Sequence, residues 1–180
     1  ADENSPVYIL GAYQAIRSYF KDEDKFVKMF KSGKGMKWGE HHHDLFEGSA
    51  LFYKPNYVGN LVSSWIPSLE GVEEKLQQGA KVADIGCGYG ISTILMAKAY
   101  PNSKFYGFDN HRPSIEKAKD QIRKEEETGG GSISNVEFVS VNANDESIGN
   151  DYDLITFFDC LHDMGDPLGA MKFARQSLKA

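Results

Sequence analysis

The chain has 180 residues, 41% of them hydrophobic and 26% charged, which is the size and composition of one folded domain with its own core. A formal net charge of −6, with no compensating basic stripe, argues against a nucleic-acid-binding surface. The sequence contains no run of about 20 apolar residues and no signal-like segment, so we expect no membrane association. The two cysteines, Cys87 and Cys160, are interpreted as reduced thiols, which favours a cytoplasmic protein.

The first 79 residues show helical patterns only, and we interpret them as a helical lid or substrate layer. Ser5 and Pro6 are typical of a helix start. Apolar residues then recur at helical spacing at Ile9, Tyr13, Ile16 and Phe20. A second helix is predicted from Asp22, with Phe26, Met29 and Phe30 turned inward. Three further helices are predicted at 44–53, 57–65 and 69–78, separated by Pro55 and Pro67.

Three adjacent histidines, His41, His42 and His43, precede Asp44. They cannot all face one ion, although alternate ones could do so in an extended segment. We therefore expect no metal site. A metal, or a histidine that contacts substrate from a loop, stays open as an alternative.

A glycine-rich turn follows the first strand pattern, at 81–85. Gly86, Gly88 and Gly90 permit backbone angles closed to other residues and let a ligand lie against the main chain. A helix predicted from near Ser92 directs its first N–H groups to the same place. This pattern predicts a ligand site at the carboxyl end of the strand.

Strands and helices alternate through residues 80–180, which predicts a parallel sheet with right-handed crossovers. The strands are expected in the order 3-2-1-4, which is half of a Rossmann-like, doubly wound α/β fold. The fourth is a near-continuous apolar run, typical of burial on both faces. The predicted strands are 81–85, 104–108, 136–141 and 152–158, and the predicted helices are 91–100, one from Pro113, and 167–178.

The spacing D-x-G-x-G-x-G from Asp84 to Gly90 resembles motif I of the class I S-adenosylmethionine-dependent methyltransferases. Asp109, at the end of the second strand, then resembles the acid that binds the cofactor ribose. Dinucleotide-binding folds use an acid in the same way, so Asp109 alone does not separate the two cofactors. The resemblance implies that these residues contact S-adenosylmethionine: Asp84, Gly86, Cys87, Gly88, Gly90, Asp109, Asn110, Asn142, Ala143 and Phe158.

Residues 41–48 and 158–167 are similar to stretches of bacterial and mycobacterial proteins assigned as methyltransferases. Those relatives carry an N-terminal winged-helix domain that this chain lacks, and the family's sheet has seven strands. We therefore expect a piece of a longer protein. The fourth strand would be an apolar edge able to recruit another chain, so a homo-oligomer is expected.

Leu161-His162-Asp163 resembles the L-H-D-W stretch of small-molecule O-methyltransferases, in which the histidine is the general base; Met164 replaces the tryptophan. The resemblance implies methyl transfer to a small molecule, at oxygen, with His162 as the catalytic residue. A non-catalytic S-adenosylmethionine-binding regulatory module and a nicotinamide-dependent enzyme stay open as alternatives. The aromatic residues of the helical layer are expected in the core, with one or two near the sulfonium; they are Phe46, Phe52, Tyr53, Tyr57 and Trp65.

Overall fold

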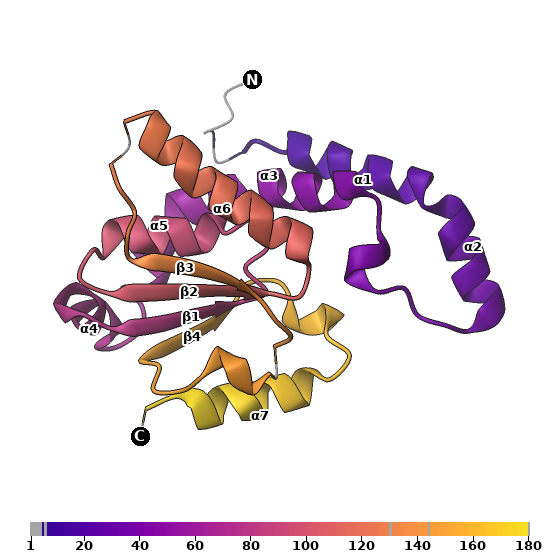
Figure 1. The fold of residues 1–180 in the computed structure, drawn as a ribbon. Helices are drawn as coiled ribbons and strands as arrows, with labels where there is room; N and C mark the ends of the chain where they lie inside the picture. The colour runs from indigo at the N-terminus through magenta and orange to yellow at the C-terminus, as the bar shows by residue number, and fades with distance from the viewer. Residues whose placement is uncertain (1–4, 6, 130, 144, 180) are drawn as a thin grey trace. The chain divides into compact units, whose positions relative to one another are not determined.

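The computed structural model describes residues 5, 7–129, 131–143 and 145–179 (Figure 1). The chain forms two compact units, Ala1–Val58 and Gly59–Ala180, each described below by itself. The sequence places the boundary between residues 79 and 80 instead. Residues 59–79 group with the sheet because a helical turn within them packs against the first helix after the glycine loop.

The first unit is helical. It contains α1 (Leu10–Lys21), α2 (Glu23–Ser32), the short η1 (Trp38–Glu40) and most of α3 (His43–Asn60). Gly11 and Gly48 lie where α1 crosses α3. A Cβ on Gly11 would come 2.4 Å from the backbone nitrogen of Phe52, and one on Gly48 would come 2.4 Å from that of Ala15. The two helices therefore pack backbone to backbone.

Three sequence expectations for this unit are wrong. The first helix begins at Leu10 rather than at Ser5, and Pro6 lies outside the described residues. Pro55 does not separate two helices, because α3 runs through it and buries its ring. Phe30, expected to turn inward, is 88% exposed. The apolar stripe on α1 is likewise exposed, since α3 covers the small residues on the opposite side.

The second unit begins with the end of α3 and a rare π-helical turn, η2 (Leu61–Trp65), followed by α4 (Val72–Gln78). Four parallel strands form a sheet in the order β3-β2-β1-β4, as the sequence predicts. In register, Asp84 of β1 stands between Gly107 of β2 and Thr156 of β4. The strands are β1 (Lys81–Ile85), β2 (Lys104–Asp109), β3 (Val136–Ser140) and β4 (Leu154–Phe157).

Helices cover both faces of this sheet (Figure 1). One face packs against α5 (Ile91–Ala99) and α6 (Arg112–Glu127). The other carries a core cluster of Ile85, Phe108 and Tyr152 that packs against Phe173 of α7 (Pro167–Ser177). Two short turns, η3 (Glu146–Ile148) and η4 (Leu161–Asp163), lie on either side of β4 in the chain.

β4 departs from its expected environment. The sequence predicts burial on both faces, but all four of its residues are only half-buried. The strand is the edge of the described sheet, so one side of its backbone has no neighbouring strand there. Among the described residues, no helix combines the length and the apolar character needed to cross a bilayer.

Candidate functional site

The glycine loop joins β1 to α5 and is held from below by β2. The carbonyl of Phe108 accepts hydrogen bonds from the backbone N–H of Gly86 at 2.7 Å and of Cys87 at 3.0 Å. Gly86 has φ +73°, and a Cβ there would lie 2.6 Å from Cβ and Sγ of Cys160. Gly88, by contrast, has open space where its Cβ would be. The loop is therefore packed against Cys160 at Gly86 and open to solvent at Gly88. A ligand that lies on the main chain requires such an open side.

Asp84 lies behind this loop and is 1% exposed. Its Oδ2 accepts hydrogen bonds from the hydroxyls of Ser92 at 2.7 Å and Thr93 at 2.6 Å, and its Oδ1 accepts one from Thr156 at 2.9 Å. Burial raises the pKa of the Asp84 carboxyl, and the three hydroxyls oppose that rise. Asp84 therefore ties the start of α5 and the neighbouring β4 to the loop. The sequence suggested a cofactor contact and gave no sign of the three hydroxyls.

Asp109, the last residue of β2, stands beside the open part of the loop. Its Oδ2 accepts a hydrogen bond from the Gly88 N–H at 2.9 Å, and its Oδ1 accepts one from the His111 N–H at 2.8 Å. Burial raises the pKa of this carboxyl, and the two backbone donors oppose that rise. Each oxygen can accept a further hydrogen bond, so Asp109 can bind two hydroxyls of a ligand that lies on Gly88.

The remaining expected cofactor residues differ in how they are placed. Cys87 is buried and its thiol points toward Gly107, so it supports the loop from within. Asn110 is exposed directly after β2. Asn142 is exposed after β3, whereas Ala143 is half-buried against the core cluster. These residues follow the carboxyl ends of neighbouring strands, which brings them to the same edge of the sheet as Asp109.

An aromatic pair marks the carboxyl end of β4. The rings of Phe158 and Trp65 stack at a centroid distance of 6.2 Å and an interplanar angle of 30°. Asp159 then adopts a left-handed conformation with φ +52°, which aspartate tolerates better than most residues. The next residue, Cys160, donates from its thiol to the Ile85 carbonyl at 3.1 Å. The sequence places Trp65 among five aromatic residues expected mostly in the core, one or two of them near the sulfonium, and does not single it out as the one at this edge.

His162 lies on η4, three residues beyond Asp159, and its side chain is 62% exposed. Its Nδ1 lies 3.8 Å from Oδ1 of Asp159, and its Nε2 lies 3.5 Å from Oδ2 of Asp163. The histidine is thus at the expected edge of the sheet, accessible, and placed between two acids.

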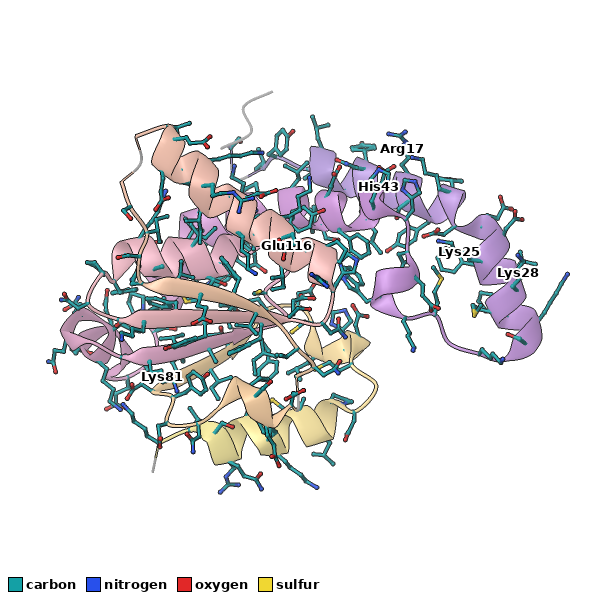
Figure 2. The ribbon with its side chains drawn as sticks, in the orientation of Figure 1. Arg17, Lys25, Lys28, His43, Lys81 and Glu116 are labelled. Atoms are coloured by element: carbon teal, nitrogen blue, oxygen red, sulfur yellow. The ribbon has the colours of Figure 1, made fainter. Side chains whose placement is uncertain are left out.

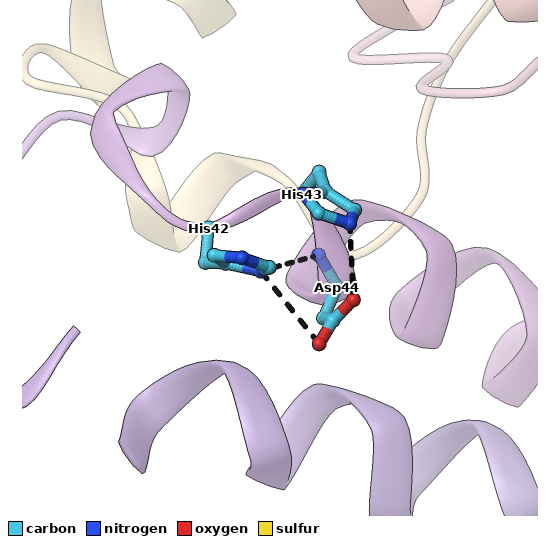
Figure 3. A group of neighbouring side chains, drawn as sticks. All are labelled: His42, His43 and Asp44. Carbon is cyan, nitrogen blue, oxygen red and sulfur yellow. Dashed lines mark hydrogen bonds and ion pairs between the residues drawn. The ribbon is translucent and has the colours of Figure 1, made fainter. Parts of the chain in front are cut away.

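The histidine segment of the first unit forms a separate polar cluster (Figure 3). Donor atoms of His42, His43 and Asp44 lie within 4.8 Å of one another, close enough to be considered for a metal ion. However, Oδ2 of Asp44 already lies 2.8 Å from the Lys21 ammonium and 3.4 Å from Nε of Arg17. Figure 2 shows Arg17 and His43 on the same side of the α1–α3 pair.

Nδ1 of His42 is already used within the same cluster, because it accepts a hydrogen bond from the Asp44 N–H at 3.2 Å. Burial lowers the pKa of His42, and the Lys21 charge lowers it further. A divalent ion would therefore have to displace two cations from the one carboxylate available. This donor set fits a structural ion-pair network better than a metal site.

Comparison with known proteins decides the family. A family profile described as "Methyltransferase domain" matches residues 76–180, which is more than half of the chain. The chain belongs to this methyltransferase family. It is a class I domain with the Rossmann-like sheet described above, and its cofactor is S-adenosylmethionine.

Individual relatives resemble the methyltransferase domain over parts of their length. A trans-aconitate 2-methyltransferase of Variovorax paradoxus (strain S110) is 38% identical over 47 residues, covering 26% of this chain and 18% of the relative. A candidate O-methyltransferase from Nostoc punctiforme PCC 73102 is 21% identical, with a TM-score of 0.58 over 76% of this chain and 37% of that one. The [4+2]-cyclase SpnF is also 21% identical, with a TM-score of 0.55 over 71% and 42%. The chain thus spans less than half of each relative, and the two structures establish the fold alone.

The residues of the methyltransferase domain fit its cofactor. A nucleoside with an amino-acid tail needs an acceptor pair for ribose hydroxyls and a bare backbone for the tail. Asp109 presents two carboxylate oxygens that could serve as the acceptor pair, and the open surface above Gly88 presents bare backbone. A side chain on Gly90, where φ is +75°, would collide with the ring of Phe138 at 2.4 Å, so this end of the loop requires glycine.

Proposed function

We propose that the methyltransferase domain transfers a methyl group to an oxygen atom of a small molecule. The observation that carries the proposal is the position of His162, accessible and flanked by Asp159 and Asp163 at the edge of the sheet that holds the glycine loop. S-adenosylmethionine, when bound, supplies a methyl group activated on a sulfonium. The protein has to hold an acceptor oxygen in line with that methyl group and remove its proton.

The expected cofactor residues would each border a different part of S-adenosylmethionine. Gly86 to Gly90 would lie against the amino-acid end, and Asp109 would accept hydrogen bonds from the ribose. Asn142 and Ala143 would border the adenine, and Asn110 and Phe158 the remaining edge. Asp84 and Cys87 would act from behind, by keeping the loop in shape.

His162 would act as the general base. A neutral imidazole accepts the proton of the acceptor hydroxyl or acid, and the neighbouring carboxylates then stabilise the imidazolium. Phe158 lies four residues before this histidine and stacks on Trp65 of η2, which favours a site with one apolar wall. The free thiols of Cys87 and Cys160 agree with a reducing, cytoplasmic compartment.

Transfer of labelled methyl to a panel of phenols and carboxylic acids, with the full-length protein, tests this function. Trans-aconitate belongs in the panel because a curated relative is named for it. His162→Ala should lower turnover by roughly 10²–10⁴-fold and leave the affinity for S-adenosylhomocysteine nearly unchanged. His43→Ala, another exposed histidine, is the matched control. Unchanged turnover in His162→Ala with loss in His43→Ala would move the base to the histidine segment.

A non-catalytic S-adenosylmethionine-binding module is the second candidate. The specific observation in its favour is that the same fold occurs in a [4+2]-cyclase, so the fold by itself does not select methyl transfer. Binding of S-adenosylhomocysteine without transfer to any member of the panel would favour this candidate. Binding of NAD in place of S-adenosylhomocysteine, measured by calorimetry, would contradict both.

A further inference from the structure

One face of the first unit is apolar and exposed to solvent. On α1 the stripe Ile9, Tyr13, Ile16 and Phe20 points away from α3, which packs on the opposite side at Gly11. On α2 it continues through Val27 and Phe30. Tyr13, Phe20 and Phe30 are 63%, 76% and 88% exposed. Monomeric proteins rarely expose contiguous apolar surface on this scale, and such a patch marks a site of interaction.

A groove of about 510 Å³ runs along this face. A single charged residue, Glu23, interrupts its otherwise apolar wall. The ring of Phe30 stands at the end of the groove and is almost entirely in solvent. The lining residues are Ile16, Tyr19, Phe20, Glu23, Phe26, Val27 and Phe30.

We propose that the α1–α2 face binds a second copy of this chain, with the two α2 helices antiparallel across a two-fold axis. Such an axis requires a surface complementary to itself. This face meets the requirement because it carries both a groove and a projecting aromatic ring. Each copy's Phe30 enters the groove of the other.

The exposed area suits a dimer. A buried aromatic side chain accounts for roughly 150–250 Å², so Tyr13, Phe20 and Phe30 together leave roughly 350–550 Å² uncovered. The aliphatic members of the stripe bring the face toward the ~800 Å² per partner of a standard interface. A shorter peptide would cover only part of it.

Charge on α2 selects the antiparallel arrangement. The first turn of this helix is acidic, with Glu23 and Asp24, and its last turn carries Lys31. Asp24 and Lys31 are seven residues apart, so they lie on the same flank of the helix, beside the groove. Two antiparallel copies place Asp24 of each opposite Lys31 of the other, whereas parallel copies place these flanks on opposite sides of the interface and form no such pair.

The edge of β4 is the rival surface for self-association. It offers four half-buried residues, and the backbone before it is already occupied, since Tyr152 bridges to Leu178 near the end of the described chain. The α1–α2 face exposes larger side chains over two helices. The two surfaces are far apart in sequence, so substitutions distinguish them.

Sedimentation velocity of the chain over a range of micromolar concentrations tests the proposal. The chain should dimerise, and Phe30→Glu should raise the dimer dissociation constant by at least about tenfold. Leu168→Glu, at a 63% exposed leucine of α7, is the matched control and should leave dimerisation unchanged. Equal thermal melting of the three proteins by circular dichroism excludes misfolding.

Charge exchange tests the arrangement. Asp24→Lys or Lys31→Glu alone should weaken the dimer about threefold or more, and the double variant should restore it, because it exchanges both members of each pair. A chain that stays monomeric at the highest concentration would overturn the proposal. So would a dimer that Phe30→Glu does not weaken, which would assign association to β4. Failure of the double variant to recover would overturn the antiparallel pairing.

Discussion

Buried aspartates occur in both units, but their surroundings differ. At the carboxyl ends of β1 and β2, the hydrogen bonds described for Asp84 and Asp109 come from hydroxyls and backbone N–H groups, and burial raises the pKa of both carboxyls. In the helical unit, the Lys21 ammonium lowers the pKa of Asp44. Burial opposes ionisation of Asp22, but Lys25 and the His42 N–H outweigh it, and the pKa of Asp22 falls.

This difference separates a binding carboxylate from a structural one. Asp44 of α3 pairs with Lys21 of α1. Asp22, between α1 and α2, pairs with Lys25 and accepts a hydrogen bond from the His42 N–H, so the two carboxylates join the three helices. Asp109 accepts hydrogen bonds from two backbone N–H groups and can still accept hydroxyls from a ligand. Asp84 has neutral partners but is enclosed, so it serves the loop rather than a ligand.

The largest effect should follow from Asp109→Ala. Loss of two charge-assisted hydrogen bonds, each worth roughly 1.5–3 kcal/mol, should weaken S-adenosylhomocysteine binding by roughly 10²–10⁴-fold in titration calorimetry. Glu116→Ala, at an exposed acid of α6 labelled in Figure 2, is the control. A loss below about threefold would remove Asp109 from the cofactor site.

Asp84→Ala should act on stability instead. It leaves the buried hydroxyls of Ser92 and Thr93 without their acceptor, whereas Thr156 keeps a longer hydrogen bond to the Ala83 carbonyl at 3.4 Å. Each such loss costs roughly 1–3 kcal/mol, so the free energy of unfolding should fall by about 3 kcal/mol or more in urea denaturation. Asp84→Asn keeps one acceptor oxygen and should lose less. Stability equal to that of the unsubstituted chain would contradict the structural role.

The two kinds of aspartate should respond to pH with opposite signs. The pKa of Asp84 is raised above its ordinary 3.8, so its contribution is complete below 3.8 and is lost as pH rises through the folded-state value. The pKa of Asp44 is lowered, so its contribution is present above 3.8 and is lost as pH falls. The free energy of unfolding should be measured from acid to neutral pH. The loss of stability with rising pH should vanish in Asp84→Asn, and the loss of stability with falling pH should vanish in Asp44→Asn. A change in pH dependence of the same sign in both variants would contradict the difference between the two kinds of aspartate.

Lys21→Met should have the smallest effect. Asp44 keeps Arg17 at 3.4 Å, and the methionine keeps the apolar stem of the lysine. We expect the thermal midpoint to fall by no more than a few degrees, with the fall reduced in high salt because the pair is partly exposed. A fall that salt does not change would show that packing, not charge, joins α1 to α3.

The sequence predicts the sheet well and the helical unit poorly. Alternation of strands and helices is a local pattern, so β1, β2 and the strand order agree with prediction. The apolar periodicity of α1 also predicts a helix, but it cannot show that Gly11 and Gly48 draw α3 onto the other side. The hydroxyls around Asp84 and the position of Trp65 depend on contacts between distant residues, which no local pattern encodes.

The π-helical turn at Leu61–Trp65 has a consequence for how relatives should be aligned. A π-turn is an α-helix with one residue inserted, and each residue rotates an α-helix by about 100°. Deleting one residue of this turn before Trp65 would leave a regular helix, yet would turn the Trp65 ring away from Phe158. A homologue can therefore share the tryptophan and still lack the aromatic pair, so helix length, not residue identity, is the trait to trace through the family.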